Sequence, residues 1–198
     1  MNRLIIESSS TQASVALFSG NELLVEEVFP SGRGPVSPLF TIVARLLTMV
    51  DTLDDLVVGV GPGSYSGIRI GISAVIGLQL ARNLQGRGIH SALGYEGGDY
   101  QVILDARGSW IFSSVRGGEI AVEPTNVTRE ELDAKIDSGL PVHSPNVVPG
   151  WVETPTFPRA AVLGQRLLSG TVTADLPLLP LYLKPPHITA AKPIVPKS

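Results

Sequence analysis

The stretch of sequence that decides the fold runs from Gly59 to Gly71 and reads GVGPGSYSGIRIG. An apolar run over residues 56–60 leads into it, and a helical pattern that reaches Leu84 follows it. Four glycines lie between positions 59 and 67, and glycine adopts backbone conformations that other residues avoid. The stretch therefore predicts a tight turn from a strand into a long helix, with a phosphate-sized group or another segment of backbone close to the start of that helix.

The chain before this turn predicts the first half of an α/β domain. Three short apolar runs separated by polar turns predict a meander of three strands, at residues 4–6, 13–18 and 23–29. A Gly/Pro/Ser-rich loop at residues 30–38 then leads into a predicted helix over residues 39–50. The resulting order of strand, strand, strand, helix, strand and helix favours a ribonuclease-H-like unit.

A change of composition at residues 94–99, GYEGGD, is the best candidate for a domain boundary. Beyond it we predict a second strand meander and two short helices, over residues 100–104, 110–115, 119–122, 129–137 and 159–168. We expect an N-terminal subdomain over residues 1–94, a C-terminal subdomain over residues 95–176 and a Pro-rich, extended tail over residues 177–198. The repeated meander predicts an α/β protein with a doubled ribonuclease-H-like fold, in which each subdomain has a mixed sheet flanked by helices.

The composition indicates a chain that builds a sizeable core and meets another protein. Of its 198 residues, 43% are hydrophobic and 17% are charged, and the mean hydropathy of +0.25 is high for a soluble monomer. The net charge of −3, with scattered Lys and Arg, argues against a protein that grips nucleic acid by itself. The absence of cysteine excludes disulfides and zinc–thiolate sites. We find no apolar signal region and no run long enough for a membrane helix, so the expected location is the cytoplasm.

Three segments resemble motifs of the TsaB (YeaZ) family. The first is the glycine-rich stretch from Gly59 to Gly71, which carries most of the resemblance. The second is ILDARG at residues 103–108, which is similar to the Leu-Asp-Ala-Arg motif that opens the second half of these proteins. The third is PLYLK at residues 180–184, which is similar to their Pro-x-Tyr-Leu-Arg tail. The resemblance implies the actin-like ATPase fold, which is built from two ribonuclease-H-like halves.

The resemblance also implies a partner role. Proteins of this family work with the TsaD enzyme in the threonylcarbamoyl modification of adenosine in tRNA. We therefore expect a non-catalytic scaffold that dimerises with and activates a TsaD-like enzyme, together with a TsaE-like ATPase. When alone, the chain is expected to form a homodimer. Its contact with tRNA is expected to be indirect, and we expect no membrane partner and no cofactor.

Both helices of the first half are apolar almost all round, and such helices are usually covered on both sides. On the second helix the small residues Gly67, Gly71 and Ala74 share the face predicted to lie on the sheet, and larger apolar residues lie opposite. Either the rest of this chain covers that outer face, or another subunit docks there, as the resemblance implies. The expected interface residues are Leu39, Val43, Leu46, Leu47 and Val50 on the first helix and Arg69, Ile72, Ser73, Ile76 and Leu80 on the second.

The motifs favour a structural glycine loop over a catalytic one. Its residues are Gly61, Pro62, Gly63, Ser64 and Gly67, and their spacing does not match a dinucleotide-binding fingerprint. A P-loop needs a lysine that this stretch lacks. The resemblance places Glu7 where actin-like ATPases carry a magnesium-organising aspartate, which indicates a vestigial nucleotide site. Two alternatives stay open: a small stand-alone ATPase or kinase-like protein of the same fold that binds ATP, and a homodimeric structural protein.

A hydrolase is disfavoured by the residues available for its chemistry. The three histidines, His90, His143 and His187, lack the paired spacing that holds a metal ion. Residues 63–67, GSYSG, miss the register of a Gly-x-Ser-x-Gly nucleophile elbow, because tyrosine stands at the central position. We therefore expect no catalytic residue and no metal site.

Overall fold

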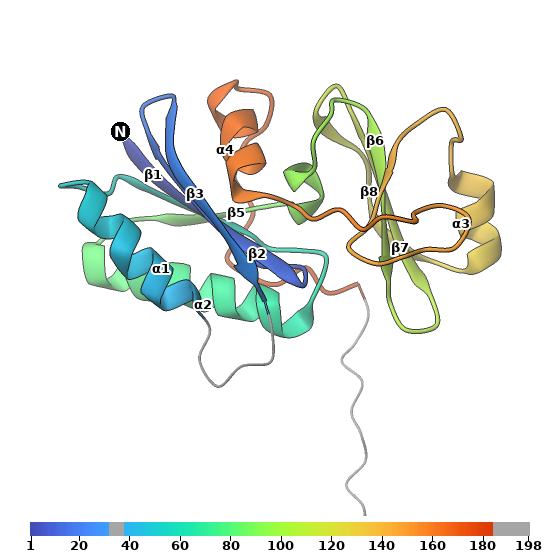
Figure 1. Cartoon of the computed structure of the whole chain (residues 1–198), viewed down its shortest axis with the longest axis horizontal. Helices are drawn as coiled ribbons and strands as arrows, with labels where there is room; N and C mark the ends of the chain where they lie inside the picture. The colour runs from blue at the N-terminus through green and yellow to red at the C-terminus, as the bar shows by residue number, and fades with distance from the viewer. Residues whose placement is uncertain (32–37, 184–198) are drawn as a thin grey trace, which may run out of the picture.

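The computed structural model describes residues 1–31 and 38–183, and in them two mixed β-sheets lie side by side (Figure 1). Residues 32–37 of the predicted loop and residues 184–198 of the predicted tail lie outside the described residues. The first sheet contains β1 (Asn2–Glu7), β2 (Gln12–Ser19), β3 (Glu22–Pro30), β4 (Asp55–Gly59) and β5 (Gly86–Ile89). The second contains β6 (Tyr100–Asp105), β7 (Trp110–Arg116), β8 (Glu119–Val127) and β9 (Val142–His143). The α-helices are α1 (Leu39–Leu46), α2 (Tyr65–Arg82), α3 (Arg129–Lys135) and α4 (Ala160–Leu168).

The first sheet has the strand order β3-β2-β1-β4-β5. Its central strand, β1, pairs antiparallel with β2 and parallel with β4. Both faces of β1 are covered, because Leu4 and Ile6 point into a core that includes α1 and α2, whereas Ile5 points into a second core that includes α4. Figure 1 shows the helices on opposite faces of this sheet. Continuous apolar runs in β1 and β4 are what such a doubly covered sheet requires.

The second sheet repeats the order of the first four strands as β8-β7-β6-β9. Here β6 takes the place of β1, because it pairs antiparallel with β7 and parallel with β9. Helix α3 lies between β8 and β9 in the sequence, as α1 lies between β3 and β4. Two copies of one ribonuclease-H-like order confirm the predicted fold class.

Helix α4 joins the two halves of the molecule. It packs on β1 and β2 of the first sheet, where Gly164 lies so close to Phe18 that an added Cβ would meet the ring at 2.3 Å. In its last turn Arg166 donates hydrogen bonds to the carbonyls of Leu93 (2.8 Å) and Tyr95 (2.9 Å), in the segment between the two sheets. The helix therefore lies after the second sheet in the sequence but completes the core of the first.

Several predicted ends differ from the observed ones, including the ends of two helices and one strand. The helix predicted over residues 39–50 ends at Leu46 and continues as a 3₁₀ turn, Leu47–Met49. The strand predicted over residues 119–122 extends to Val127, because β8 is an edge strand that accommodates Pro124. The helix predicted over residues 129–137 is α3, which ends at Lys135. Its first turn is fixed by a capping box, in which the Thr128 hydroxyl accepts from the Glu131 N–H and the Glu131 carboxylate accepts from the Thr128 N–H.

Candidate functional site

The glycine-rich turn lies against the chain's own β1–β2 turn. The N–H of Ser64 donates to the Ser9 carbonyl at 2.6 Å, and a Cβ added at Gly63 would lie 2.2 Å from the same oxygen. A Cβ added at Gly67 would lie 2.0 Å from the Ser8 carbonyl oxygen. The sequence predicts either a phosphate-sized group or a backbone segment at the start of α2. In the structure a backbone segment, the β1–β2 turn, lies there.

The serine at the head of α2 acts as a helix cap. Ser64 Oγ accepts from the Gly67 N–H at 3.3 Å, which is the usual role of serine at this position. The described histidines are engaged elsewhere: His90 Nε2 lies 3.4 Å from a Glu123 oxygen, and His143 Nδ1 lies 3.1 Å from Thr156 Oγ1. His187 lies outside the described residues. No serine–histidine pair therefore forms in the described part of the chain.

Glu7 ends β1 at the cleft between the two sheets. Its carboxyl group is fully buried, and Oε1 accepts from the Ser9 N–H at 2.7 Å. The other oxygen, Oε2, has no hydrogen-bond partner among the described residues. Burial raises the pKa of Glu7 above its ordinary value, because the charged form is excluded from water. Gly59 makes room for this group, since an added Cβ there would lie 1.9 Å from Oε2.

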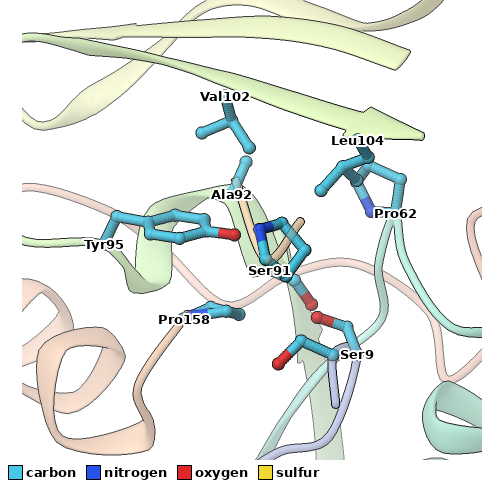
Figure 2. Close-up of a pocket in the computed structure, with 10 residues that line it drawn as sticks. Ser9, Pro62, Ser91, Ala92, Tyr95, Val102, Leu104 and Pro158 are labelled. Atoms are coloured by element: carbon cyan, nitrogen blue, oxygen red, sulfur yellow. The ribbon is translucent and has the colours of Figure 1, made fainter. Parts of the chain in front are cut away.

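Beside Glu7 the cleft is narrow and filled by the protein's own side chains. Figure 2 shows Ser9 and Ser91 among the residues that line it, with Tyr95 and Pro158 on one side and Pro62 on the other. The cavity volume between them is about 10 Å³, which is roughly the room that one water molecule needs. Glu7 and the serines of the β1–β2 turn are therefore not arranged around a space of nucleotide size.

Glu7→Gln is expected to stabilise the protein at neutral pH. The raised pKa means that the folded state holds the proton to a higher pH than the unfolded chain, which releases it above about pH 4.5, the ordinary pKa of a glutamate side chain in water. The stability of the native protein should therefore be greatest below that pH and fall as pH rises through the raised pKa. Glutamine imitates the neutral carboxyl group but has no proton to lose, so we expect the variant to be more stable than wild type at pH 7 and its stability to depend less on pH.

Urea unfolding between pH 4 and pH 8 measures this effect, with Glu119→Gln, at an exposed position, as the matched control. The control should follow the wild-type pH dependence. A Glu7→Gln variant that is less stable than wild type at pH 7 and equally pH-dependent would show that Glu7 is ionised in the folded protein.

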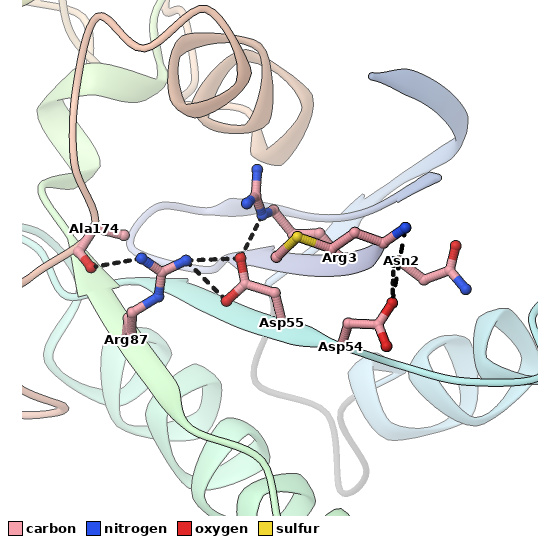
Figure 3. Close-up of polar contacts among 7 residues, drawn as sticks. Asn2, Arg3, Asp54, Asp55, Arg87 and Ala174 are labelled. Atoms are coloured by element: carbon pink, nitrogen blue, oxygen red, sulfur yellow. Dashed lines mark hydrogen bonds and ion pairs between the residues drawn. The ribbon is translucent and has the colours of Figure 1, made fainter. Parts of the chain in front are cut away.

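A second buried charged cluster supports the sheet and is separate from the cleft. Figure 3 shows Asp55 at the start of β4, where it accepts from Arg3 Nε at 2.5 Å and from Arg87 Nη2 at 2.7 Å. Arg87 also donates to the Ala174 carbonyl, which ties the C-terminal segment to β5. No group of three or more His, Cys, Asp or Glu residues that could hold a metal ion occurs among residues 1–31 and 38–183.

The residues expected at an interface divide into a buried set and an exposed set. Contrary to that expectation, Leu39, Val43, Leu46 and Ile72 are buried in the core between the helices and the first sheet. Leu47 and Val50 are half-buried against the same core. Leu39, Val43 and Leu46 recur at the spacing of the one face that α1 turns to the first sheet, so the chain's own core covers them.

For Ile72 the physical reason lies at the glycines of α2. Because these glycines have no side chain, the helix lies very close to the β1–β2 turn. The residues on either side of the glycines are buried as a result, with Ile68 and Ile72 on one side and Ala74 on the other.

The exposed set follows one side of α2. Arg69, Ser73, Ile76 and Leu80 are exposed, and with Tyr65 they form what we call the α2 row. These positions recur at three- and four-residue spacings, so they share one side of the helix. Ile76 is 40% exposed and Leu80 is 78% exposed, so two apolar side chains one turn apart meet solvent on this side of the helix.

Sequence reasoning missed three exposed aromatic residues, one of which, Tyr65, belongs to this row. Phe40 on α1, Tyr65 at the start of α2 and Tyr182 in the C-terminal segment each expose about half of their surface, at 52%, 45% and 42%. Tyr182 lies in the PLYLK segment that resembles a family motif, which was the available signal.

The fold is shared with solved YeaZ structures. YeaZ from Pseudomonas aeruginosa matches with a TM-score of 0.68 and 20% sequence identity, over 92% of this chain and 99% of that chain. A structure described as an uncharacterized protein with similarity to peptidase YEAZ from Pseudomonas aeruginosa matches with a TM-score of 0.71 and 19% identity, over the same 92% and 99%. The sequence itself matches no family model and no curated protein. The resemblance to YeaZ is thus confirmed in the fold.

Among the described residues, none of the helices combines the length and the apolar character needed to span a bilayer.

Proposed function

We propose that this protein is a non-catalytic subunit of the TsaB type, which docks through the α2 row on a TsaD-like enzyme and activates it for the threonylcarbamoyl modification of adenosine in tRNA. The observation that supports this most is the exposure of Ile76 and Leu80 in a chain with the fold of YeaZ. Apolar surface removed from water by a partner contributes roughly 25 cal/mol per Å². A TsaE-like ATPase joins this complex, and tRNA is contacted by the enzyme subunit.

The cleft supports a role without catalysis. The start of α2 is capped by Ser64 and meets the Ser9 carbonyl, so the N–H groups of Ser64 and Gly67 donate to the chain itself rather than to a phosphate. The carboxyl group of Glu7 is buried and engaged by the Ser9 N–H, which leaves it poorly placed to organise magnesium in water. The competing proposal, a stand-alone ATPase of the same fold, needs this cleft to open around ATP.

Calorimetry with ATP and magnesium separates these proposals. We expect no micromolar binding by the chain alone, because the cleft beside Glu7 is smaller than a typical ligand site. Micromolar binding that is lost in Glu7→Ala would favour the ATPase and contradict the scaffold role.

The partner role is tested by mixing the protein with the TsaD-like protein of the same organism. Analytical ultracentrifugation should show a complex at micromolar concentration, and the enzyme should modify tRNA faster in that complex. An enzyme that neither binds this chain nor responds to it would contradict the proposal. A second copy of this chain is the competing occupant of the α2 row, and sedimentation of the protein alone shows whether it forms a homodimer.

A further inference from the structure

At the start of α2, three exposed side chains form one ordered cluster. Tyr65 and Tyr182 stack with their ring centroids 4.9 Å apart and their planes 20° apart. The guanidinium of Arg69 lies over the Tyr65 ring, 5.1 Å from its centroid, and Nη1 donates to the Tyr65 hydroxyl at 2.6 Å. The cation–π contact and the hydrogen bond fix the plane of the guanidinium at the surface.

Tyr182 is held in place by the backbone of the first sheet. Leu176 and Gly88 exchange two backbone hydrogen bonds beside β5, of 2.8 and 3.1 Å. Further along, the N–H of Leu181 donates to the Val60 carbonyl at 2.8 Å, directly before the glycine-rich turn. The C-terminal segment therefore delivers Tyr182 to the start of α2, and the cluster is organised before any partner arrives.

Arg69 lacks the counter-charge that most arginines of this protein have. Within the described residues it forms no ion pair, and neither α1 nor α2 contains an aspartate or a glutamate. By contrast, Arg45 pairs with Glu27, Arg116 with Asp137 and Arg129 with Asp133. An exposed, pre-oriented guanidinium beside two tyrosines has the composition of an interface anchor, since Tyr and Arg are enriched at interface hot spots.

We infer that Arg69 is the point at which the α2 row recognises a carboxylate of its protein partner, an inference that rests on the proposed function. Arg69 and Ile76 lie seven residues apart on one side of α2, which corresponds to about 10 Å along the helix. The partner surface therefore carries an acidic side chain that faces Arg69. About 10 Å away it carries apolar side chains that cover Ile76 and Leu80. The planar fork of arginine matches a carboxylate with two parallel hydrogen bonds.

Charge disfavours a second copy of this chain as the occupant. In a symmetric dimer the α2 helices of the two copies pack side by side. If they run parallel, Arg69 of one copy faces Arg69 of the other. If they run antiparallel and cross at Ile76, Arg69 of one copy faces the end of the other helix that carries Arg82. Since α1 and α2 offer no carboxylate, both arrangements leave Arg69 facing another arginine or neutral groups. An acidic partner removes this mismatch.

The test compares Arg69→Gln with Arg82→Gln in the full chain, with the TsaD-like protein as the probe. Both arginines are exposed on α2 and form no ion pair in the described structure, but Arg82 lies about 120° around the helix from Ile76. We expect Arg69→Gln to raise the Kd at least tenfold and Arg82→Gln to change it less than threefold. Arg69→Lys, which keeps the charge but loses the fork, should lie between them. Circular dichroism checks that all three variants melt like wild type.

Equal Kd values for Arg69→Gln and Arg82→Gln would overturn the inference while leaving the partner role intact, whereas a wild-type chain that binds no TsaD-like protein would contradict the proposed function itself. Two further measurements cover the other occupants. Loss of a homodimer in Arg69→Gln alone, seen by sedimentation, would assign the site to a second copy. Loss of binding to labelled tRNA in Arg69→Gln alone would assign it to phosphate. Either result would overturn the acidic-protein inference.

Discussion

Ile72→Glu is expected to unfold the protein, whereas Ile76→Glu, one helical turn further along α2, should leave it folded and abolish binding to the TsaD-like partner. Ile72 is only 5% exposed and packs in the core between α2 and the first sheet. An unpaired carboxylate at that position costs several kcal/mol, which is comparable to a total stability of about 5–15 kcal/mol. Ile76 is 40% exposed, so its carboxylate stays in water until a partner covers it.

Circular dichroism melts and sedimentation with the partner distinguish the two outcomes. Leu80→Glu is a second exposed variant of the α2 row and should behave like Ile76→Glu, with a wild-type melting temperature and weakened binding. If Ile76→Glu and Leu80→Glu both bind the partner like wild type, the row is an ordinary solvent-facing surface and the docking proposal is wrong. If Ile72→Glu melts like wild type, α2 is rotated relative to the structure described above.

The fold could be predicted because its signals are local. The alternation of apolar runs with turn residues locates β1, β2 and β3, and the four glycines locate the turn between β4 and α2. Repetition of the strand meander after the segment at residues 94–99 then indicates a second unit of the same kind. Each of these inferences uses only residues that are neighbours in the sequence.

The division of the α2 residues into buried and exposed could not be predicted in the same way. It depends on where the β1–β2 turn meets the helix, a contact between residues 59 positions apart, in which Ser8 Oγ donates to the Gly67 carbonyl. The stacking of Tyr182 on Tyr65 likewise depends on the path of the C-terminal segment. The periodicity of a helix shows that it has an apolar face, but the segment that packs against it decides how wide that face is.

Gly67→Ala is expected to destabilise the protein, although alanine is the better helix former. The new Cβ would lie 2.0 Å from the Ser8 carbonyl oxygen, a backbone atom held in the turn that continues from β1. Overpacking of this kind costs about 1–3 kcal/mol or more, against a gain of up to about 1 kcal/mol from replacing glycine in a helix. We therefore expect a net loss of stability and a displacement of α2 from the β1–β2 turn.

Gly77→Ala is the matched control on the same helix. Gly77 is exposed and nothing lies within 4 Å of an added Cβ, so only the helix propensity changes and the protein should become more stable by about 0.5–1 kcal/mol. Urea unfolding of the two variants should therefore give shifts of opposite sign. A Gly67→Ala variant stabilised as much as Gly77→Ala would mean that the β1–β2 turn does not lie against α2. The head of the helix would then be open to a ligand, which is the arrangement that the ATPase alternative requires.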